Sequence, residues 1–119
     1  MINAVLTIDD VASANTPAIV DYLNAHEITA LMFAVGENIE KYYDNAVYAL
    51  KNGMILGNHS YSHPAFSKLS IEEAMEDIEK MRQFWKNYMR MPVLKGSIGH
   101  SDFRMEIKAE QIRKHSKNF

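Results

Sequence analysis

The sequence has no cysteine among its 119 residues, which excludes disulfide bonds, thiolate metal ligands and a cysteine nucleophile. It also lacks an apolar run near the roughly 18 residues that cross a membrane. The N-terminus has neither the basic segment nor the small-residue cleavage site of a secretory leader. From the sequence as written, we expect a cytoplasmic protein with no membrane-spanning segment.

Neither sign of charge dominates, because the formal net charge is −2, and this argues against electrostatic binding of nucleic acid by the whole chain. Residues 1–92 carry 12 acidic and 7 basic side chains, whereas residues 93–119 carry 3 acidic and 6 basic ones. We therefore expect residues 1–92 to form the N-terminal part of a folded domain. Residues 93–119 are expected to form a divergent basic segment that consists of a loop and a helix. Such a tail without interleaved aromatic residues is typical of a solvated surface and not of a nucleic-acid module.

Short apolar runs alternate with helical patterns along the first 92 residues. We expect strands at residues 4–8, 28–35 and 54–56, each buried like the strands of a parallel sheet. Helices are expected at residues 16–26, 39–52 and from 71 onward, the last introduced by the capping box Ser70-Ile71-Glu72-Glu73. This alternation predicts right-handed βαβ units and an α/β fold with a parallel sheet.

Apolar residues at helical spacing indicate which helix faces are buried. The first helix is expected to turn Ile19, Val20 and Leu23 inward. In the third helix the stripe recurs every three or four residues and comprises Ile71, Ala74, Met75, Ile78, Met81, Trp85 and Tyr88. Core packing explains these methionines and this tryptophan better than a cofactor site does.

Polar residues that can carry chemistry follow two of the expected strands. Asp9 and Asp10 come after the first strand, and His59 and His63 come after the third. Because the carboxyl ends of parallel strands meet at one edge of the sheet, we expect these side chains to converge. An Asp-Asp pair or two histidines four residues apart would each be unremarkable alone. The pair of motifs at one edge favours a functional site.

Two imidazoles and one carboxylate form a ligand set for a catalytic metal, since three protein ligands leave positions open for water and substrate. Adjacent aspartates do not easily reach the same metal, so one of Asp9 and Asp10 is left to act as a general base. The residues alone do not decide which. A bound metal would acidify water and polarise a carbonyl, which suits hydrolysis of an amide or ester. His26 and His115 are expected to be solvated surface groups.

Two sequence motifs resemble those of the NodB-type polysaccharide deacetylases (carbohydrate esterase family 4). Residues 6–10 (LTIDD) resemble the first motif, TFDDG, and residues 58–63 (NHSYSH) contain the second motif, H-[ST]-x-x-H. The motifs lie about 50 residues apart, and a helix, strand, helix and strand between them also fit the family. The resemblance extends over roughly residues 3–92.

The resemblance implies a fold, an activity and a role for each motif residue. The fold would be a distorted (β/α) barrel, here partial because the sequence ends about halfway round. Asp9 would be the catalytic base, and Asp10, His59 and His63 would bind a divalent metal, most simply Zn²⁺. The reaction would remove acetyl groups from N- or O-acetylated carbohydrate.

The sequence departs from the family pattern at several positions. Val11 follows the aspartates where a glycine is usual. Arg90-Met91-Pro92-Val93 resembles a third motif, R-x-P-Y, and Arg90 would orient the base, although valine replaces the tyrosine. His100 is a poor candidate for the general acid of the last motif. We therefore expect an altered or truncated C-terminal part, such as a frameshift or deletion would produce.

The alternative hypothesis is a non-catalytic remnant of such a domain. Half a barrel leaves sheet edges uncovered, so the chain would act as a metal-binding or interaction module. A second copy would then complete the half-barrel as a homo-oligomer.

Overall fold

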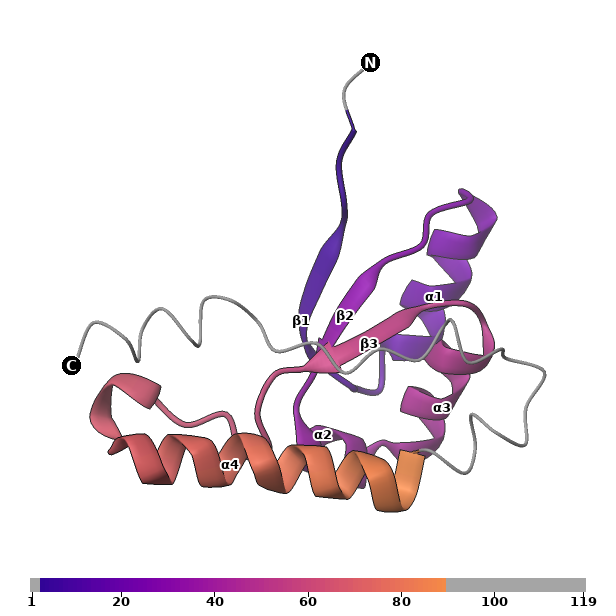
Figure 1. Cartoon of the computed structure of the whole chain (residues 1–119). Helices are drawn as coiled ribbons and strands as arrows, with labels where there is room; N and C mark the ends of the chain where they lie inside the picture. The colour runs from indigo at the N-terminus through magenta and orange to yellow at the C-terminus, as the bar shows by residue number, and fades with distance from the viewer. Residues whose placement is uncertain (1–2, 90–119) are drawn as a thin grey trace.

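The computed structural model describes residues 3–89 (Figure 1). In this part, three parallel strands form one sheet in the order β1-β2-β3, with β1 at Thr7–Val11, β2 at Leu31–Ala34 and β3 at Ile55–Asn58. The predicted α/β fold with a parallel sheet is therefore confirmed. Arg90, Val93, His100, His115 and the segment 93–119 lie outside the described residues.

The bounds of the strands differ from those expected from the apolar runs. Strand β1 begins at Thr7 and continues through both aspartates, whereas Val5 and Leu6 are 77% and 43% exposed. The prediction of a buried strand over 4–8 was wrong, because β1 lies at an edge of the described sheet and pairs there with β2 alone. Strand β3 extends through Asn58 because hydrogen bonding to β2 continues, with the His59 N–H donating to the Ala34 carbonyl at 3.0 Å.

Within residues 3–89, four α-helices and two short helical turns connect and follow the strands. Their bounds are Thr16–Ala25 (α1), Gly36–Lys41 (α2), Tyr43–Lys51 (α3) and Ile71–Phe84 (α4), with a 3₁₀ turn at Phe66–Lys68 (η1) and a π turn at Trp85–Met89 (η2). The single helix expected over 39–52 is two helices, because Tyr42 leaves helical geometry with φ −124° and ψ 48°. Gly53 follows α3 in the left-handed region, with φ 91°, as a C-terminal glycine does.

The helices pack around the sheet to form the core. Figure 1 shows α1 and α3 together on one side of the strands, with the long α4 crossing below them. Val20 and Leu23 are buried as predicted, and the buried methionines are core residues, namely Met32, Met54, Met81 and Met89. Ile19, Met75 and Tyr88 are instead 37%, 64% and 57% exposed. The apolar stripes predicted for these helices therefore include residues that no other described element covers.

The side chain of Ser70 caps α4, because its Oγ accepts the Glu73 N–H at 3.2 Å. We expect Ser70→Ala to lower the free energy of unfolding by about 1 kcal/mol, since one N–H in the first turn loses its partner. Urea denaturation measures this loss. Ser67→Ala, at an exposed position in η1, is the matched control and should leave the midpoint unchanged. Equal midpoints for both variants would contradict the capping role.

Candidate functional site

Three side chains that could bind a metal converge where β1 and β3 end. The Asp10 Oδ1 atom lies 3.1 Å from His59 Nε2 and 3.3 Å from His63 Nε2. One ligand atom from each of the three residues lies within 4.8 Å of the others. The topology thus brings together residues about 50 positions apart in sequence.

The distances from the Asp10 oxygen to the two histidine nitrogens fit tetrahedral coordination of one ion. Zinc binds nitrogen and oxygen at about 2.0–2.1 Å, and tetrahedral angles then separate two ligand atoms by about 3.3 Å. Both distances to the Asp10 oxygen are close to this separation. Imidazole nitrogen and carboxylate oxygen are also ligands that zinc accepts. Hydrogen bonds from the imidazoles to Asp10 would have similar lengths. A metal titration therefore distinguishes a metal site from a hydrogen-bonded cluster.

A bulge in β1 directs the Asp10 side chain. Asp9 pairs with Phe33 and Val11 pairs with Ala34, which leaves Asp10 as the extra residue. Its φ of 63° lies in the left-handed region, and such bulges change the direction of a side chain. The sequence analysis placed both aspartates beyond the strand. The structure places them within it, and the carboxylate of the bulged Asp10 lies beside both histidines.

The backbone at Asp10 is held by the start of α2. The Asn38 side-chain amide donates to the Asp10 carbonyl oxygen at 3.1 Å. The sequence analysis missed Asn38, and no motif marks it. Only the packing of α2 against β1 reveals its contact with the site.

The segment after β3 forms a tight loop that presents both histidines. Ser60 and His63 have positive φ values of 70° and 55°. The Asn58 Oδ1 atom accepts the Ser60 N–H at 2.8 Å, and the Ser60 Oγ atom accepts the His63 N–H at 2.9 Å. The side chains of Asn58 and Ser60, on either side of His59, therefore accept hydrogen bonds from backbone N–H groups of this loop.

The middle of this loop is fixed against α2. The N–H groups of Gly36 and Glu37 donate to the carbonyls of Ser60 and Tyr61 at 3.1 and 2.9 Å. Gly36 has no side chain where the Tyr61 ring packs, since an added Cβ would lie 2.3 Å from Tyr61 Cδ2. Burial, together with Glu40, raises the pKa of Tyr61 to about 12, so its phenol stays neutral at physiological pH.

The three convergent residues differ in exposure. His59 is buried and packs 6.3 Å from the Phe33 ring, between ring centroids. The side chains of His63 and Asp10 are 53% and 60% exposed. The site therefore has a buried histidine at its base and an open side that a large substrate could approach.

The sequence analysis also named Asp9, Arg90 and His26. Asp9 is exposed on β1 beside Asp10, and Arg90 lies outside the described residues. His26 is exposed at the end of α1 and packs on Tyr22, as expected of a surface histidine.

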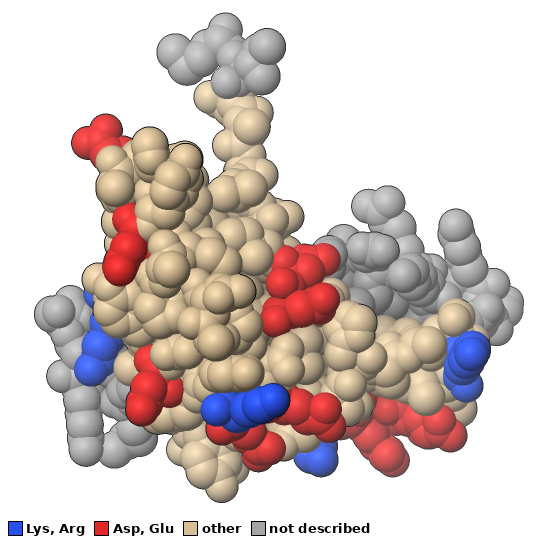
Figure 2. Space-filling model, turned by 180° about the vertical axis from the view of Figure 1, so that it is seen from behind, with Lys and Arg blue, Asp and Glu red and all other residues tan. Residues whose placement is uncertain are grey.

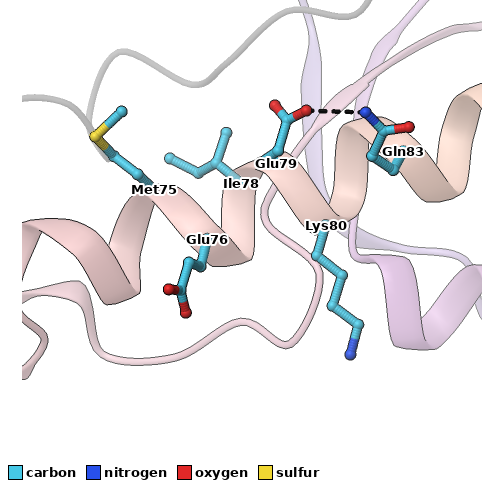
Figure 3. A pocket seen from close by; sticks show the side chains of 6 residues that line it. All are labelled: Met75, Glu76, Ile78, Glu79, Lys80 and Gln83. Carbon is cyan, nitrogen blue, oxygen red and sulfur yellow. Dashed lines mark hydrogen bonds between the residues drawn. The ribbon is translucent and has the colours of Figure 1, made fainter.

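A separate hollow of about 730 Å³ runs along α4 (Figure 3). It is lined by Met75, Glu76, Ile78, Glu79, Lys80 and Gln83. The Glu79 carboxylate accepts a 3.0 Å hydrogen bond from the Gln83 amide, and the apolar part is formed by the Met75 and Ile78 side chains. Asp10, His59 and His63 do not line this hollow.

No helix in residues 3–89 is both long enough and apolar enough to cross a membrane.

Comparison with known proteins gives a consistent result. The polysaccharide deacetylase family model matches residues 2–94. A peptidoglycan-N-acetylglucosamine deacetylase of Bacillus cereus is 40% identical over 80 residues, which are 66% of this chain and 29% of that protein. The peptidoglycan-N-acetylmuramic acid deacetylase PdaC of Bacillus subtilis is 38% identical over 74 residues, covering 61% of this chain and 16% of that protein. The chain thus spans less than a third of these relatives.

Solved structures share the fold. The Bc1960 peptidoglycan N-acetylglucosamine deacetylase superposes with a TM-score of 0.68 at 29% identity, covering 97% of this chain and 53% of that one. A family 4 carbohydrate esterase from Bacillus anthracis gives 0.65 at 29% identity, covering 71% and 41%. The likeness confirms the predicted NodB-type fold, of which this chain spans a part. With its family model matched over most of its length, the chain belongs to the polysaccharide deacetylase family.

Proposed function

We propose that this chain is a metal-dependent deacetylase acting on N-acetylated carbohydrate of the peptidoglycan type. The observation that carries the proposal is the convergence of Asp10, His59 and His63 within 4.8 Å. The relatives whose names specify deacetylation of peptidoglycan support the substrate class. Zinc is the proposed metal because two imidazoles and one carboxylate match its preferred ligands.

Each residue has a proposed task. A divalent metal held by the three ligands would supply Lewis acidity to an acetyl carbonyl and would acidify water. His59 would fix the ion from the buried side, while Asp10 and His63 would hold it from the exposed side. Asp9, adjacent to Asp10 on β1, would accept the proton of the attacking water as general base. Arg90 is proposed to orient Asp9, following the family resemblance.

The charge on the surface does not favour a nucleic acid as the substrate. In Figure 2, basic side chains lie singly among acidic ones and form no continuous patch on that face. Residues 1–92 carry a net charge of −5 from 12 acidic and 7 basic groups. This excess of negative charge opposes binding to a nucleic acid backbone.

A second candidate function is metal binding or association without catalysis. The observation that favours it is the edge position of β1, which pairs with β2 alone in the described sheet. Exposed Val5 and Leu6 precede that strand. An edge of this kind is a template for pairing with another chain, and a second copy of this chain is the partner proposed here.

The test is acetate release from acetylated chitin oligomers and peptidoglycan fragments by the metal-stripped protein. We expect no release without metal and restored release on adding one equivalent of zinc, because the metal supplies most of the polarisation of the carbonyl. Coupled enzymatic detection of acetate measures it. Zinc binding without acetate release from either substrate would instead favour the non-catalytic function. Failure to bind zinc would contradict the proposed metal site itself.

A further inference from the structure

The carboxylate of Asp77, on α4, contacts the loop between the two histidines. Its Oδ1 atom accepts the N–H of Tyr61 at 2.7 Å and the N–H of Ser62 at 3.1 Å. Its other oxygen accepts a hydrogen bond from the Ser62 hydroxyl. One side chain thus holds two consecutive backbone donors and one side-chain donor in the middle of the loop. Hydrogen bonds to an ionised acceptor are stronger than neutral ones.

A second contact ties α4 to the start of the same loop. The Asn58 amide donates to the Ile78 carbonyl at 3.4 Å, one residue beyond Asp77. The other side of the Asn58 amide accepts the Ser60 N–H. Helix α4 therefore holds the loop both immediately before His59 and between the two histidines.

The loop needs this support, because its backbone conformation is unfavourable for ordinary side chains. Ser60 and His63 both have positive φ, at 70° and 55°. Such conformations persist only where surrounding contacts over-determine them. Asp77 binds the two residues that lie between them in the chain.

We propose that Asp77 is a positioning residue that sets the geometry of His63 relative to His59 and Asp10. This proposal rests on the metal site put forward above and extends it to α4. Asp77 would not touch the metal, the substrate or the reacting atoms. Its effect would act through the backbone of Tyr61 and Ser62. Partners outside the ligand shell of this kind change metal affinity by about 10–100-fold.

The first test is a zinc titration of Asp77→Ala, with Glu76→Ala as the matched control. Glu76 is the neighbouring residue on α4, is exposed and carries the same charge. We expect Asp77→Ala to raise the zinc dissociation constant by about 10–100-fold, whereas Glu76→Ala should leave it unchanged. Equal constants for the two variants would overturn the proposal. An unfolded Asp77→Ala chain by circular dichroism would also overturn it, in favour of a purely structural role.

Asp77→Asn separates hydrogen bonding from charge. The amide keeps an oxygen for both backbone N–H groups, and its nitrogen can donate to Ser62 Oγ. We expect this variant to recover zinc affinity to within about threefold of the original chain, because it retains the outer-shell contacts. Affinity as poor as that of Asp77→Ala would mean that the hydrogen bonds to Tyr61 and Ser62 do not set the zinc affinity, and would overturn the positioning role.

Hydrogen exchange in the metal-free protein tests the same contact without any ligand. We expect the amides of Tyr61 and Ser62 to exchange at least about tenfold faster in Asp77→Ala than in Glu76→Ala, since local opening of the loop becomes easier. Unchanged exchange would overturn the proposal even if the chain binds zinc. Conversely, a chain that binds no zinc but shows faster exchange would contradict the proposed function while leaving Asp77 as the residue that holds the loop.

Discussion

His63→Ala is expected to weaken zinc binding by about 100-fold. The ligands of a four-ligand structural zinc site together supply roughly 10–16 kcal/mol, so one ligand contributes on the order of 3 kcal/mol. In this chain only two protein ligands would remain, Asp10 and His59, whose facing atoms lie 3.1 Å apart. Isothermal titration calorimetry of the metal-stripped protein measures the change.

His26→Ala is the control for this prediction, because it removes an exposed imidazole that packs on Tyr22 at the end of α1. Its zinc affinity should equal that of the unmodified chain. A His63→Ala variant that binds zinc as tightly as the His26→Ala control would show that His63 is not a ligand. The 3.3 Å contact with Asp10 would then be a hydrogen bond.

Asp9→Asn is expected to lower the rate of acetate release by about 10²–10⁴-fold, the usual contribution of a general base. Asparagine has a similar shape but cannot accept the proton. Zinc affinity should fall less than in His63→Ala, because Asp9 is proposed to lie outside the ligand set. Initial rates on acetylated chitin oligomers and a parallel zinc titration give both numbers.

Asp44→Asn is the matched control, since it removes an exposed carboxylate from the first turn of α3, away from the site. Undiminished acetate release from Asp9→Asn would exclude Asp9 as the base. Loss of zinc in Asp9→Asn would mean instead that the two aspartates exchange the roles proposed for them.

The parallel sheet could be predicted from the sequence because three short apolar runs alternate with helical patterns. The placement of the polar motifs at one edge follows from that topology alone. The family resemblance rested on residues 6–10 and 58–63, and the family match extends over residues 2–94. The fold class therefore depends on features that recur along the first 92 residues.

The choice between Asp9 and Asp10 could not be predicted from the residues. It depends on a bulge that leaves Asp10 unpaired in β1 with φ 63°. No glycine marks this position, and a carboxylate in the left-handed region gives no sequence pattern to recognise. A strand without the bulge would have paired Asp10 directly with β2.

The break between two helices at Tyr42 and the exposure of Met75 could not be predicted from the sequence either. Apolar periodicity continues across Tyr42, so one helix was the simplest prediction, although the backbone turns there. Met75 occupies a position of the α4 stripe that no described element covers. Helical spacing identifies a face, whereas burial depends on what else packs there.

The residues that hold the backbone of the site were not predicted from the sequence, for a related reason. Asn38 and Asp77 lie on helices, at positions that have no motif of their own. Asn38 contacts the Asp10 backbone, and Asp77 contacts the backbone of the loop that carries the histidines. Such partners are defined by the packing of α2 and α4 against the strand ends, which the sequence does not specify.

The most direct test of the central claim is an anomalous-difference map at the zinc edge from a crystal of this chain grown with zinc. The account predicts a single strong peak about 2.0–2.2 Å from Asp10 Oδ1 and from the Nε2 atoms of His59 and His63. The remaining coordination positions should be open to solvent. A map with no peak at these three residues, in a crystal where their side chains are ordered, would contradict the account.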